Sequence, residues 1–155
     1  LEKERRGTGG ALVDAWDKLE DEFLLLNGDS ILNGDWRLLF PLLQQEETGA
    51  VIGLTAVQNQ GRYGGVDCVG DLIVQFREKD SKFSNPGLVN AGVYALKKKA
   101  IGEFLKLLSS LEIDVFSAMA VQGSIRGVEL KGFFIDIGLP ETLEYSREHL
   151  LDHLH

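Results

Sequence analysis

Apolar residues follow a helical spacing in five stretches of this chain and form short, strand-like runs between them. In the first stretch they recur every three or four residues from Leu12 to Leu19, and Thr8 is placed to cap the helix. Pro140 stands at the first turn of the last stretch, a common position for proline. The predicted helices cover residues 11–19, 35–47, 97–110, 114–122 and 141–151.

The apolar runs between these helices predict strands. The run at 23–26 is continuously apolar, which favours a central strand buried on both faces. Gly70 and Asp71 separate two short runs and indicate a hairpin, and a last strand pair is expected around Lys131 and Gly132. The predicted strands cover residues 23–26, 50–57, 66–69, 72–74, 89–96, 125–130 and 133–137. Helices that alternate with strands predict an α/β fold, in which one mixed sheet has helices on its faces.

Size, charge and cysteine content narrow the class of protein. The chain has 155 residues, of which 44% are hydrophobic and 26% charged, so it matches one globular domain with a core. A formal charge of −8 argues against a general surface for nucleic acid or anionic membranes. No apolar run reaches the roughly 18 residues of a membrane span, no signal peptide is visible, and Cys68 has no cysteine partner, so a cytoplasmic location is expected.

Two aspartates about a hundred residues apart carry the most specific chemical signal. Asp29 and Asp136 each end an apolar run and stand next to a glycine. In open α/β sheets ligands gather beyond the carboxyl ends of the strands, so two such carboxylates can converge on one cation. Mg²⁺ is commonly held by one or two carboxylates together with phosphate oxygens, which suggests a phosphorylated substrate. The alternative is that each aspartate only caps a turn or a helix at a strand end.

The order of several short motifs resembles the sugar-1-phosphate nucleotidylyltransferase family over nearly the whole chain. The motifs are a Gly-Thr-Gly-Gly-Ala-Leu turn, Asn-Gly-Asp, Tyr-Gly, Glu-Lys, Asn-Ala-Gly-x-Tyr and Asp-Ile-Gly-x-Pro-Glu. They stand at residues 7–12, 27–29, 63–64, 78–79, 90–94 and 136–141. Within the family, the mannose and heptose 1-phosphate guanylyltransferases are most similar. The resemblance implies a mainly parallel, Rossmann-like sheet and an enzyme that makes a nucleotide-sugar and pyrophosphate from a nucleoside triphosphate, GTP being favoured, and a sugar 1-phosphate.

The resemblance also implies a role for each matching residue. Asp29 and Asp136 would hold Mg²⁺, and Lys79 would reach the sugar phosphate as a catalytic point charge. Residues implied to bind the nucleotide are Gly7, Thr8, Gly9, Gly10, Asn27 and Gly28. Residues implied to bind the sugar phosphate are Gly64, Glu78, Lys79 and Asn90. For the glycines and Asn90 the alternative is ordinary turn chemistry.

The family's first strand and its Gly-x-Gly-Thr-Arg-Leu phosphate loop do not occur in this sequence. We therefore interpret residues 1–155 as the C-terminal portion of one nucleotidyltransferase domain. The competing hypothesis is a truncated, non-catalytic module that binds a sugar phosphate or a nucleotide-sugar. A dinucleotide-binding oxidoreductase is disfavoured because no Gly-x-Gly-x-x-Gly follows a strand. The run at 23–26 would also lack neighbouring strands, and such an open apolar edge is expected to favour a homo-oligomer.

Overall fold

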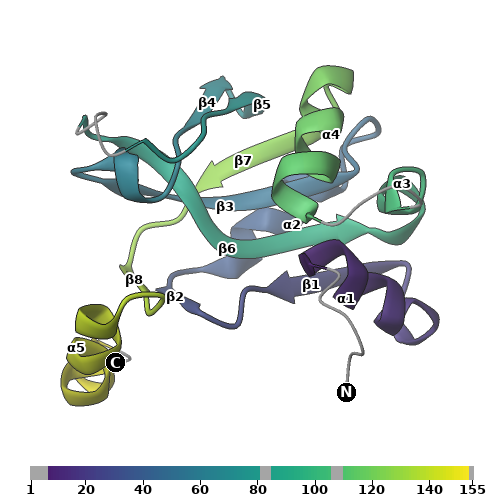
Figure 1. The fold of residues 1–155 in the computed structure, drawn as a ribbon. Coiled ribbons are helices and arrows are strands. Elements are labelled where there is room, and N and C mark those ends of the chain that lie inside the picture. Colours follow the sequence, from purple (N-terminus) through teal and green to yellow (C-terminus); the bar gives the residue numbers. More distant parts are fainter. Residues whose placement is uncertain (1–6, 81–84, 106–109, 154–155) are drawn as a thin grey trace.

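The computed structural model describes residues 7–80, 85–105 and 110–153. Its main sheet has six strands in the order β1-β6-β3-β7-β5-β4 (Figure 1). A second sheet pairs β2 with β8 and lies at the lower left of Figure 1. The strands are β1 (Glu22–Leu26), β2 (Ser30–Asn33), β3 (Ala50–Val57), β4 (Val66–Val69), β5 (Leu72–Phe76), β6 (Gly87–Lys97), β7 (Ile125–Glu129) and β8 (Phe133–Asp136).

The sheet is mixed and flanked by helices, as predicted from the sequence, but it is not mainly parallel. Only β3 and β7 pair in parallel within the part of the chain that the structure describes, and every other strand pairing there is antiparallel. Part of the physical reason lies in the segment of the chain between β3 and β6, where β4 and β5 form an antiparallel pair. Parallel neighbours need a crossover connection of a dozen or more residues, whereas β4 and β5 are joined by a two-residue turn at Gly70 and Asp71.

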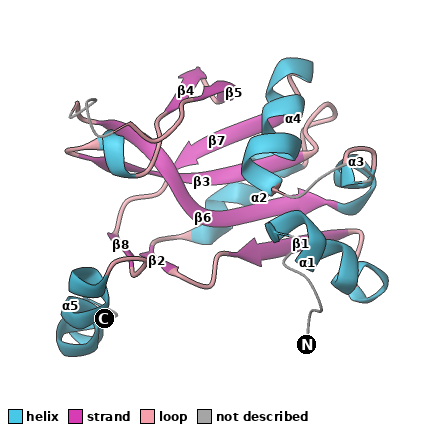
Figure 2. Cartoon of the chain, in the orientation of Figure 1, coloured by secondary structure: helices cyan, strands magenta, loops and turns pink. Residues whose placement is uncertain are grey.

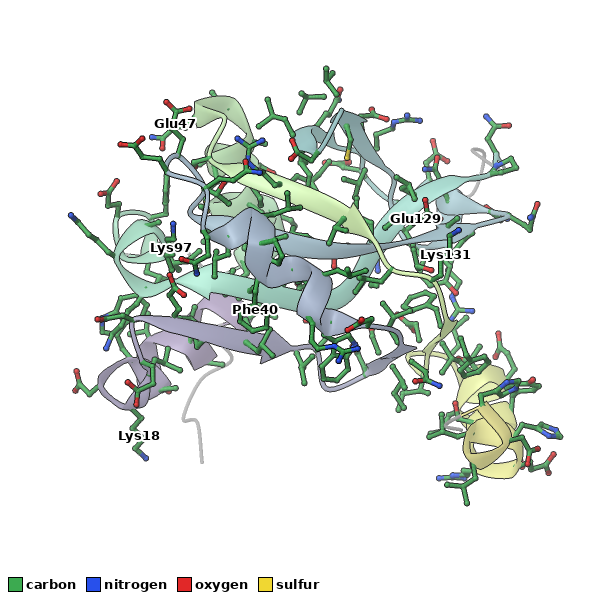
Figure 3. The ribbon with its side chains drawn as sticks, turned by 180° about the vertical axis from the view of Figure 1, so that it is seen from behind. Lys18, Phe40, Glu47, Lys97, Glu129 and Lys131 are labelled. Carbon is green, nitrogen blue, oxygen red and sulfur yellow. The ribbon has the colours of Figure 1, made fainter. Side chains whose placement is uncertain are left out.

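Helices cover both faces of the main sheet (Figure 2). On one face α1 (Gly7–Ala15), α4 (Ser117–Gln122) and the π-helical segment η5 (Leu111–Phe116) enclose a core around Tyr94 and Phe116. On the other face α2 (Leu39–Leu43) packs on β3 and β6. Figure 3 shows this helix from behind, with Phe40 on its side toward β1. Every helix among the described residues is either too short or too polar to span a lipid bilayer.

Several predicted helices are shorter than their periodicity suggested. Residues 35–47 form only the 3-10 turn η2 (Trp36–Leu38) and α2, and residues 97–105 form α3 (Lys98–Gly102), while 106–109 lie outside the described residues. The first helix begins at Gly7 rather than at residue 11 and is followed by η1 (Trp16–Lys18). Apolar spacing marks the face that a segment buries, but it does not decide how many turns follow one another.

Strand β1 lies at an edge of the sheet, which corrects the prediction of a central strand. Its residues alternate between exposed and half-buried, with Leu24 at 40% and Leu26 at 47% exposed. These two leucines pair with Ala95 and Val93 of β6, so they share the face that carries α2. In the described part of the chain, β1 has β6 as its one strand neighbour, and the predicted open apolar edge is therefore present.

The last two strands exist as predicted but do not pair with each other. Strand β7 lies between β3 and β5, whereas β8 leaves the main sheet and pairs with β2, a strand that was not predicted. Helix α5 (Pro140–His149) and η6 (Leu150–His153) follow β8. The His153 ring stacks on Phe133 at 3.9 Å between ring centroids, which holds this C-terminal segment against the small sheet.

Candidate functional site

The candidate site lies where strand β6 bends. The register of β3 against β6 shifts between Gly53, opposite Val93, and Leu54, opposite Asn90, which is a β-bulge. Gly92 has a left-handed φ of +74° there, and a Cβ at this position would lie 3.0 Å from the Cβ of both Asn27 and Ser30. Glycine is thus required by backbone shape and by close approach together. The bend lets the turn after β1 pack directly on β6, where the Asn27 amide donates to the Gly92 carbonyl at 2.8 Å.

This turn brings Asp29 next to Asp136. The chain reverses after β1 and enters β2, and β2 pairs with β8 so that Ser30 stands opposite Asp136. The Ile137 amide donates to the Asp29 carbonyl oxygen at 2.8 Å. Asp29 was expected to stand at the end of a strand of the main sheet, and this was wrong. It directly precedes β2, a strand of the small sheet. The two aspartates are nevertheless backbone neighbours at one end of the small sheet.

Arg62 binds Asp136, one of the two neighbouring aspartates. Its Nη2 atom donates to Asp136 Oδ1 at 3.2 Å, to the Asp136 carbonyl oxygen at 3.1 Å and to Thr142 Oγ1 at 3.3 Å. The Gly138 amide donates to the same Asp136 Oδ1 at 2.8 Å. Sequence analysis did not identify Arg62. Its one signal was its place immediately before the Tyr63-Gly64 motif.

A buried tyrosine connects the nucleotide-side and sugar-side residues predicted from the sequence. The Tyr94 hydroxyl receives a hydrogen bond from Asn90 Nδ2 at 3.0 Å and lies 3.3 Å from Asn27 Oδ1 and 3.4 Å from Glu112 Oε1. The Thr8 hydroxyl lies 3.2 Å from Glu112 Oε2 and accepts from the Leu111 amide at 2.9 Å. Thr8, Asn27 and Asn90 thus belong to one network centred on Tyr94 and Glu112, and Glu112 is a further residue that sequence analysis missed.

The tyrosine network predicts a specific dependence of stability on pH. Burial, and then the Glu112 charge, raise the pKa of Tyr94 above its ordinary value of 10.0. Above pH 10 the unfolded chain releases this proton while the folded chain keeps it, so Tyr94 makes stability fall with pH by up to about 1.4 kcal/mol per unit. We expect the free-energy difference of unfolding between the wild type and Tyr94→Phe to shrink from pH 9 to pH 11. Urea unfolding at each pH measures it, and a constant difference would contradict the assignment.

The predicted sugar-phosphate residues Gly64, Glu78 and Lys79 form a second group. Gly64 is buried with a φ of +83°, and a Cβ there would lie 2.6 Å from the Arg77 carbonyl oxygen and 3.7 Å from the Lys79 nitrogen. The turn of Gly64 therefore packs against the segment after β5. Glu78 and Lys79 are exposed on that segment. Because Gly64 follows Arg62 by two residues, this group adjoins the Arg62–Asp136 pair along the chain.

The glycine cluster has a different structure from the predicted turn. Gly7, with a φ of +70°, begins α1, and Gly9 and Gly10 are buried in its first turns. Thr8 does not cap the helix, because its hydroxyl accepts a hydrogen bond from the Leu111 amide and contacts the Glu112 carboxylate. Gly28 has nothing within 4 Å of its Cβ position and lies open in the turn before Asp29.

The donor atoms around Asp29 and Asp136 fit a hard divalent cation. Both side chains offer carboxylate oxygens, and the neighbouring donors to Asp136 hold one of its two oxygens. Among the described residues there is no group of three or more histidine, cysteine or acidic side chains that could hold a metal. Two carboxylates completed by substrate oxygens are a usual arrangement for Mg²⁺, so the pair suits an ion that arrives with a phosphorylated substrate.

Comparison with known proteins gives a family and several relatives. The family model described as "Nucleotidyl transferase" matches residues 1–151. The chain is 33% identical over 145 residues to the mannose-1-phosphate guanylyltransferase catalytic subunit beta of Danio rerio, covering 90% of this chain and 40% of the relative. It is 30% identical over 153 residues to the D-glycero-alpha-D-manno-heptose 1-phosphate guanylyltransferase of Aneurinibacillus thermoaerophilus. This match covers 97% of this chain and 65% of the relative.

Solved structures show the same fold. HddC from Yersinia pseudotuberculosis, in a crystal structure complexed with GMP-PN, superimposes with a TM-score of 0.80 at 28% identity, over 96% of this chain and 64% of that one. HddC without that ligand gives a TM-score of 0.81. The chain thus spans between about two fifths and two thirds of the length of these proteins.

Proposed function

We propose that this chain, which belongs to the nucleotidyl transferase family, forms part of an enzyme that makes nucleotide-sugars. The reaction is attack by a phosphate oxygen of a sugar 1-phosphate on the α-phosphorus of a nucleoside triphosphate. The bond between the α-phosphorus and its bridging oxygen breaks, and pyrophosphate leaves. The observation that carries the proposal is the adjacency of Asp29 and Asp136, which come from distant parts of the sequence.

Such a reaction depends mainly on positioning and charge neutralisation. Asp29 and Asp136 would hold Mg²⁺, which when bound neutralises phosphate charge and polarises the reacting phosphoryl group. Arg62 fixes the Asp136 carboxylate through one oxygen and leaves the other free for this role. Lys79, exposed beside the Gly64 turn, would bind the sugar phosphate, with Glu78 and Asn90 toward the sugar hydroxyls.

The nucleotide would lie against α1 and the turn at 27–29. Gly7 is exposed at the start of α1 and has no side chain to keep a base away, whereas Gly9 and Gly10 are buried, and Asn27 is held by Tyr94 and Gly92. GTP is the favoured nucleotide and mannose or heptose 1-phosphate the favoured acceptor, because the relatives described above are named as guanylyltransferases for these sugars. A cytoplasmic location is part of the same proposal.

The test is pyrophosphate release by the protein that carries this chain. We expect release that requires Mg²⁺, GTP and either mannose 1-phosphate or heptose 1-phosphate, with less release from ATP, UTP or dTTP. Saturable binding of a sugar 1-phosphate without pyrophosphate release from any nucleotide would replace the enzyme with the non-catalytic binding module. If the protein neither binds a sugar 1-phosphate nor releases pyrophosphate, both the enzyme and the binding module are rejected.

The open edge of β1 also supports a proposal about assembly. Leu24 and Leu26 are partly exposed beside an unpaired strand edge, an arrangement that invites pairing with another chain. We expect this chain to self-associate at micromolar concentrations, and Leu24→Lys to shift it toward the monomer in light scattering coupled to gel filtration. Val121→Lys is the matched control, because Val121 is 89% exposed on α4, away from that edge. Equal masses for all three proteins would reject the edge as an interface.

A further inference from the structure

The hydroxyl hydrogen of Tyr94 has two competing acceptors. The Gly92 amide donates to Asn90 Oδ1 at 2.9 Å, so the Nδ2 atom of Asn90 is the one that donates to the Tyr94 oxygen, at 3.0 Å. Tyr94 then has its own hydrogen left to donate. Asn27 Oδ1 lies 3.3 Å and Glu112 Oε1 lies 3.4 Å from the hydroxyl oxygen, so the two acceptors compete at nearly equal distance.

Glu112 links this tyrosine to α1. Its other oxygen, Oε2, accepts hydrogen bonds from the hydroxyls of Thr8 and Ser110, both at 3.2 Å. Thr8 is exposed near the start of α1, Tyr94 is buried, and the half-buried Glu112 lies between them. The charge of one carboxylate is therefore shared between an exposed hydroxyl and a buried one.

The cap of η5 does not use the Glu112 carboxylate. The Ser110 hydroxyl accepts from the Ile113 amide at 3.2 Å, and the Asp114 carboxylate accepts from the Ser110 amide at 3.0 Å. Among the described residues, the hydrogen bonds to the Glu112 carboxylate come from side-chain hydroxyls. Glu112 also lies in a π-helical segment, a rare conformation that is frequent at functional sites.

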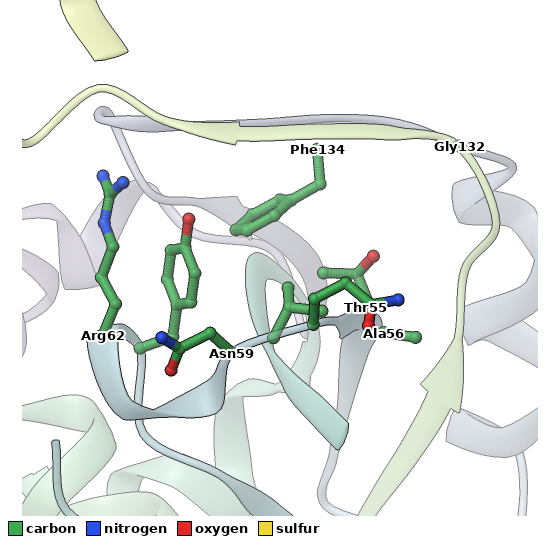
Figure 4. A pocket seen from close by; sticks show the side chains of 9 residues that line it. Thr55, Ala56, Asn59, Arg62, Gly132 and Phe134 are labelled. Atoms are coloured by element: carbon green, nitrogen blue, oxygen red, sulfur yellow. The ribbon is translucent and has the colours of Figure 1, made fainter. Parts of the chain in front are cut away.

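The other end of the network adjoins a cavity. Asn90 pairs with Leu54 of β3. The next residue, Thr55, lines a cavity of about 430 Å³ that has Arg62 on its wall (Figure 4). Asn90 Nδ2 carries two hydrogens, of which Tyr94 takes one, so the second remains for a ligand oxygen.

We propose that Glu112 is a positioning residue that couples nucleotide binding to sugar 1-phosphate binding through the Tyr94 hydroxyl. This inference rests on the proposed function, which places the nucleotide against α1 and the sugar hydroxyls near Asn90. No residue of the network reacts with a substrate. Its role is to set the strength with which Asn90 is held.

The coupling follows from the competition for the tyrosine hydrogen. A nucleotide that takes the Thr8 hydroxyl removes one donor from Glu112, whose carboxylate then attracts the Tyr94 hydrogen more strongly. A tyrosine that donates to a charged carboxylate is itself a better acceptor, so it holds Asn90 more firmly. The nucleotide therefore tightens binding of the sugar 1-phosphate, and by linkage the sugar 1-phosphate tightens nucleotide binding by the same factor.

Calorimetry of the protein that carries this chain tests the coupling. The probes are mannose 1-phosphate and a GTP analogue with a methylene group between its α- and β-phosphates, which binds without reacting. We expect the analogue to tighten wild-type binding of mannose 1-phosphate about fivefold, and Glu112→Gln to remove this effect. In that variant the hydroxyls of Thr8 and Ser110 hold the amide oxygen, so the amide nitrogen faces Tyr94 and donates to it. Tyr94→Phe should remove the effect as well.

Asp114→Asn is the matched control, because Asp114 is an acidic residue of the same segment and caps it. It should leave the fivefold effect unchanged even where it lowers stability. In the ligand-free protein, Glu112→Gln should shift the NMR signals of the Asn27 and Asn90 side-chain amides, whereas Asp114→Asn should not.

Three results overturn the inference. They are a wild type in which the analogue does not tighten mannose 1-phosphate binding, an effect that survives Glu112→Gln, and an effect that Asp114→Asn removes equally. Pyrophosphate release by the wild type is scored separately. Release without coupled binding rejects the inference alone, whereas coupled binding without release rejects only the transfer reaction.

Discussion

Replacing Asp136 with asparagine is expected to lower Mg²⁺-dependent pyrophosphate release by at least about a hundredfold. Asparagine keeps the size of the side chain and can still accept the Gly138 amide hydrogen bond through its Oδ1 atom. The substitution therefore removes mainly the negative charge beside Asp29. If this charge holds the cation, the affinity for Mg²⁺ must fall together with turnover. Calorimetric titration of Mg²⁺ measures this binding independently of catalysis.

Asp35→Asn is the matched control for this experiment. Asp35 also pairs with an arginine, Arg37, through hydrogen bonds of 2.7 and 2.9 Å, but it lies exposed at the start of η2. Its loss should leave both Mg²⁺ affinity and pyrophosphate release unchanged. If Asp136→Asn bound Mg²⁺ like the wild type, the aspartate would be only a strand-end residue, and the proposed metal site would be rejected.

The sequence predicted best where local chemistry decides the structure. Strand β3 has the predicted bounds, 50–57, because β-branched residues follow a glycine that ends the preceding segment. The hairpin of β4 and β5 forms at Gly70, which has a left-handed φ of +63°. A residue without a Cβ adopts this conformation easily. In both cases the residues that determine the element lie within it or next to it.

Prediction was weaker where a distant partner decides. The apolar run of β1 indicated burial on both faces, yet two of its leucines are partly exposed because β1 lies at an edge. β8 was assigned to β7, its neighbour in sequence, but pairs with β2. The register and edge position of a strand depend on which strand is adjacent in space. The periodicity of apolar residues does not identify that neighbour.

The candidate site shows the same division. Asp29 and Asp136 were singled out from short motifs as a carboxylate pair, and the structure makes them backbone neighbours by a route other than the expected one. Arg62 and Glu112 were missed because each acts across a large sequence separation, Arg62 on Asp136 and Glu112 on Thr8. An isolated arginine or glutamate in a polar segment has no local pattern to distinguish it from a solvated side chain.

The close contact of β8 with β2 predicts a severe effect of Gly132→Ala. Gly132 has a φ of +155°, and a Cβ there would overlap the carbonyl oxygen of Asn33 and lie 2.6 Å from its carbonyl carbon. These are backbone atoms of β2, so the clash can be relieved only by separating the two strands. We expect a loss of about 3 kcal/mol or more in the free energy of unfolding, measured by urea denaturation.

Gly70→Ala separates backbone strain from this clash. Gly70 also has a left-handed φ, +63°, but nothing lies within 4 Å of its Cβ position, so the expected cost is only about 1 kcal/mol. Because β2 and β8 carry the residues that bring Asp29 and Asp136 together, Gly132→Ala should also weaken Mg²⁺ binding under conditions where it remains folded, whereas Gly70→Ala should not. Equal stabilities of the two variants would show that the clash at Gly132 is relieved without separating β2 from β8, and unchanged Mg²⁺ binding by folded Gly132→Ala would contradict the dependence of the metal site on this pairing.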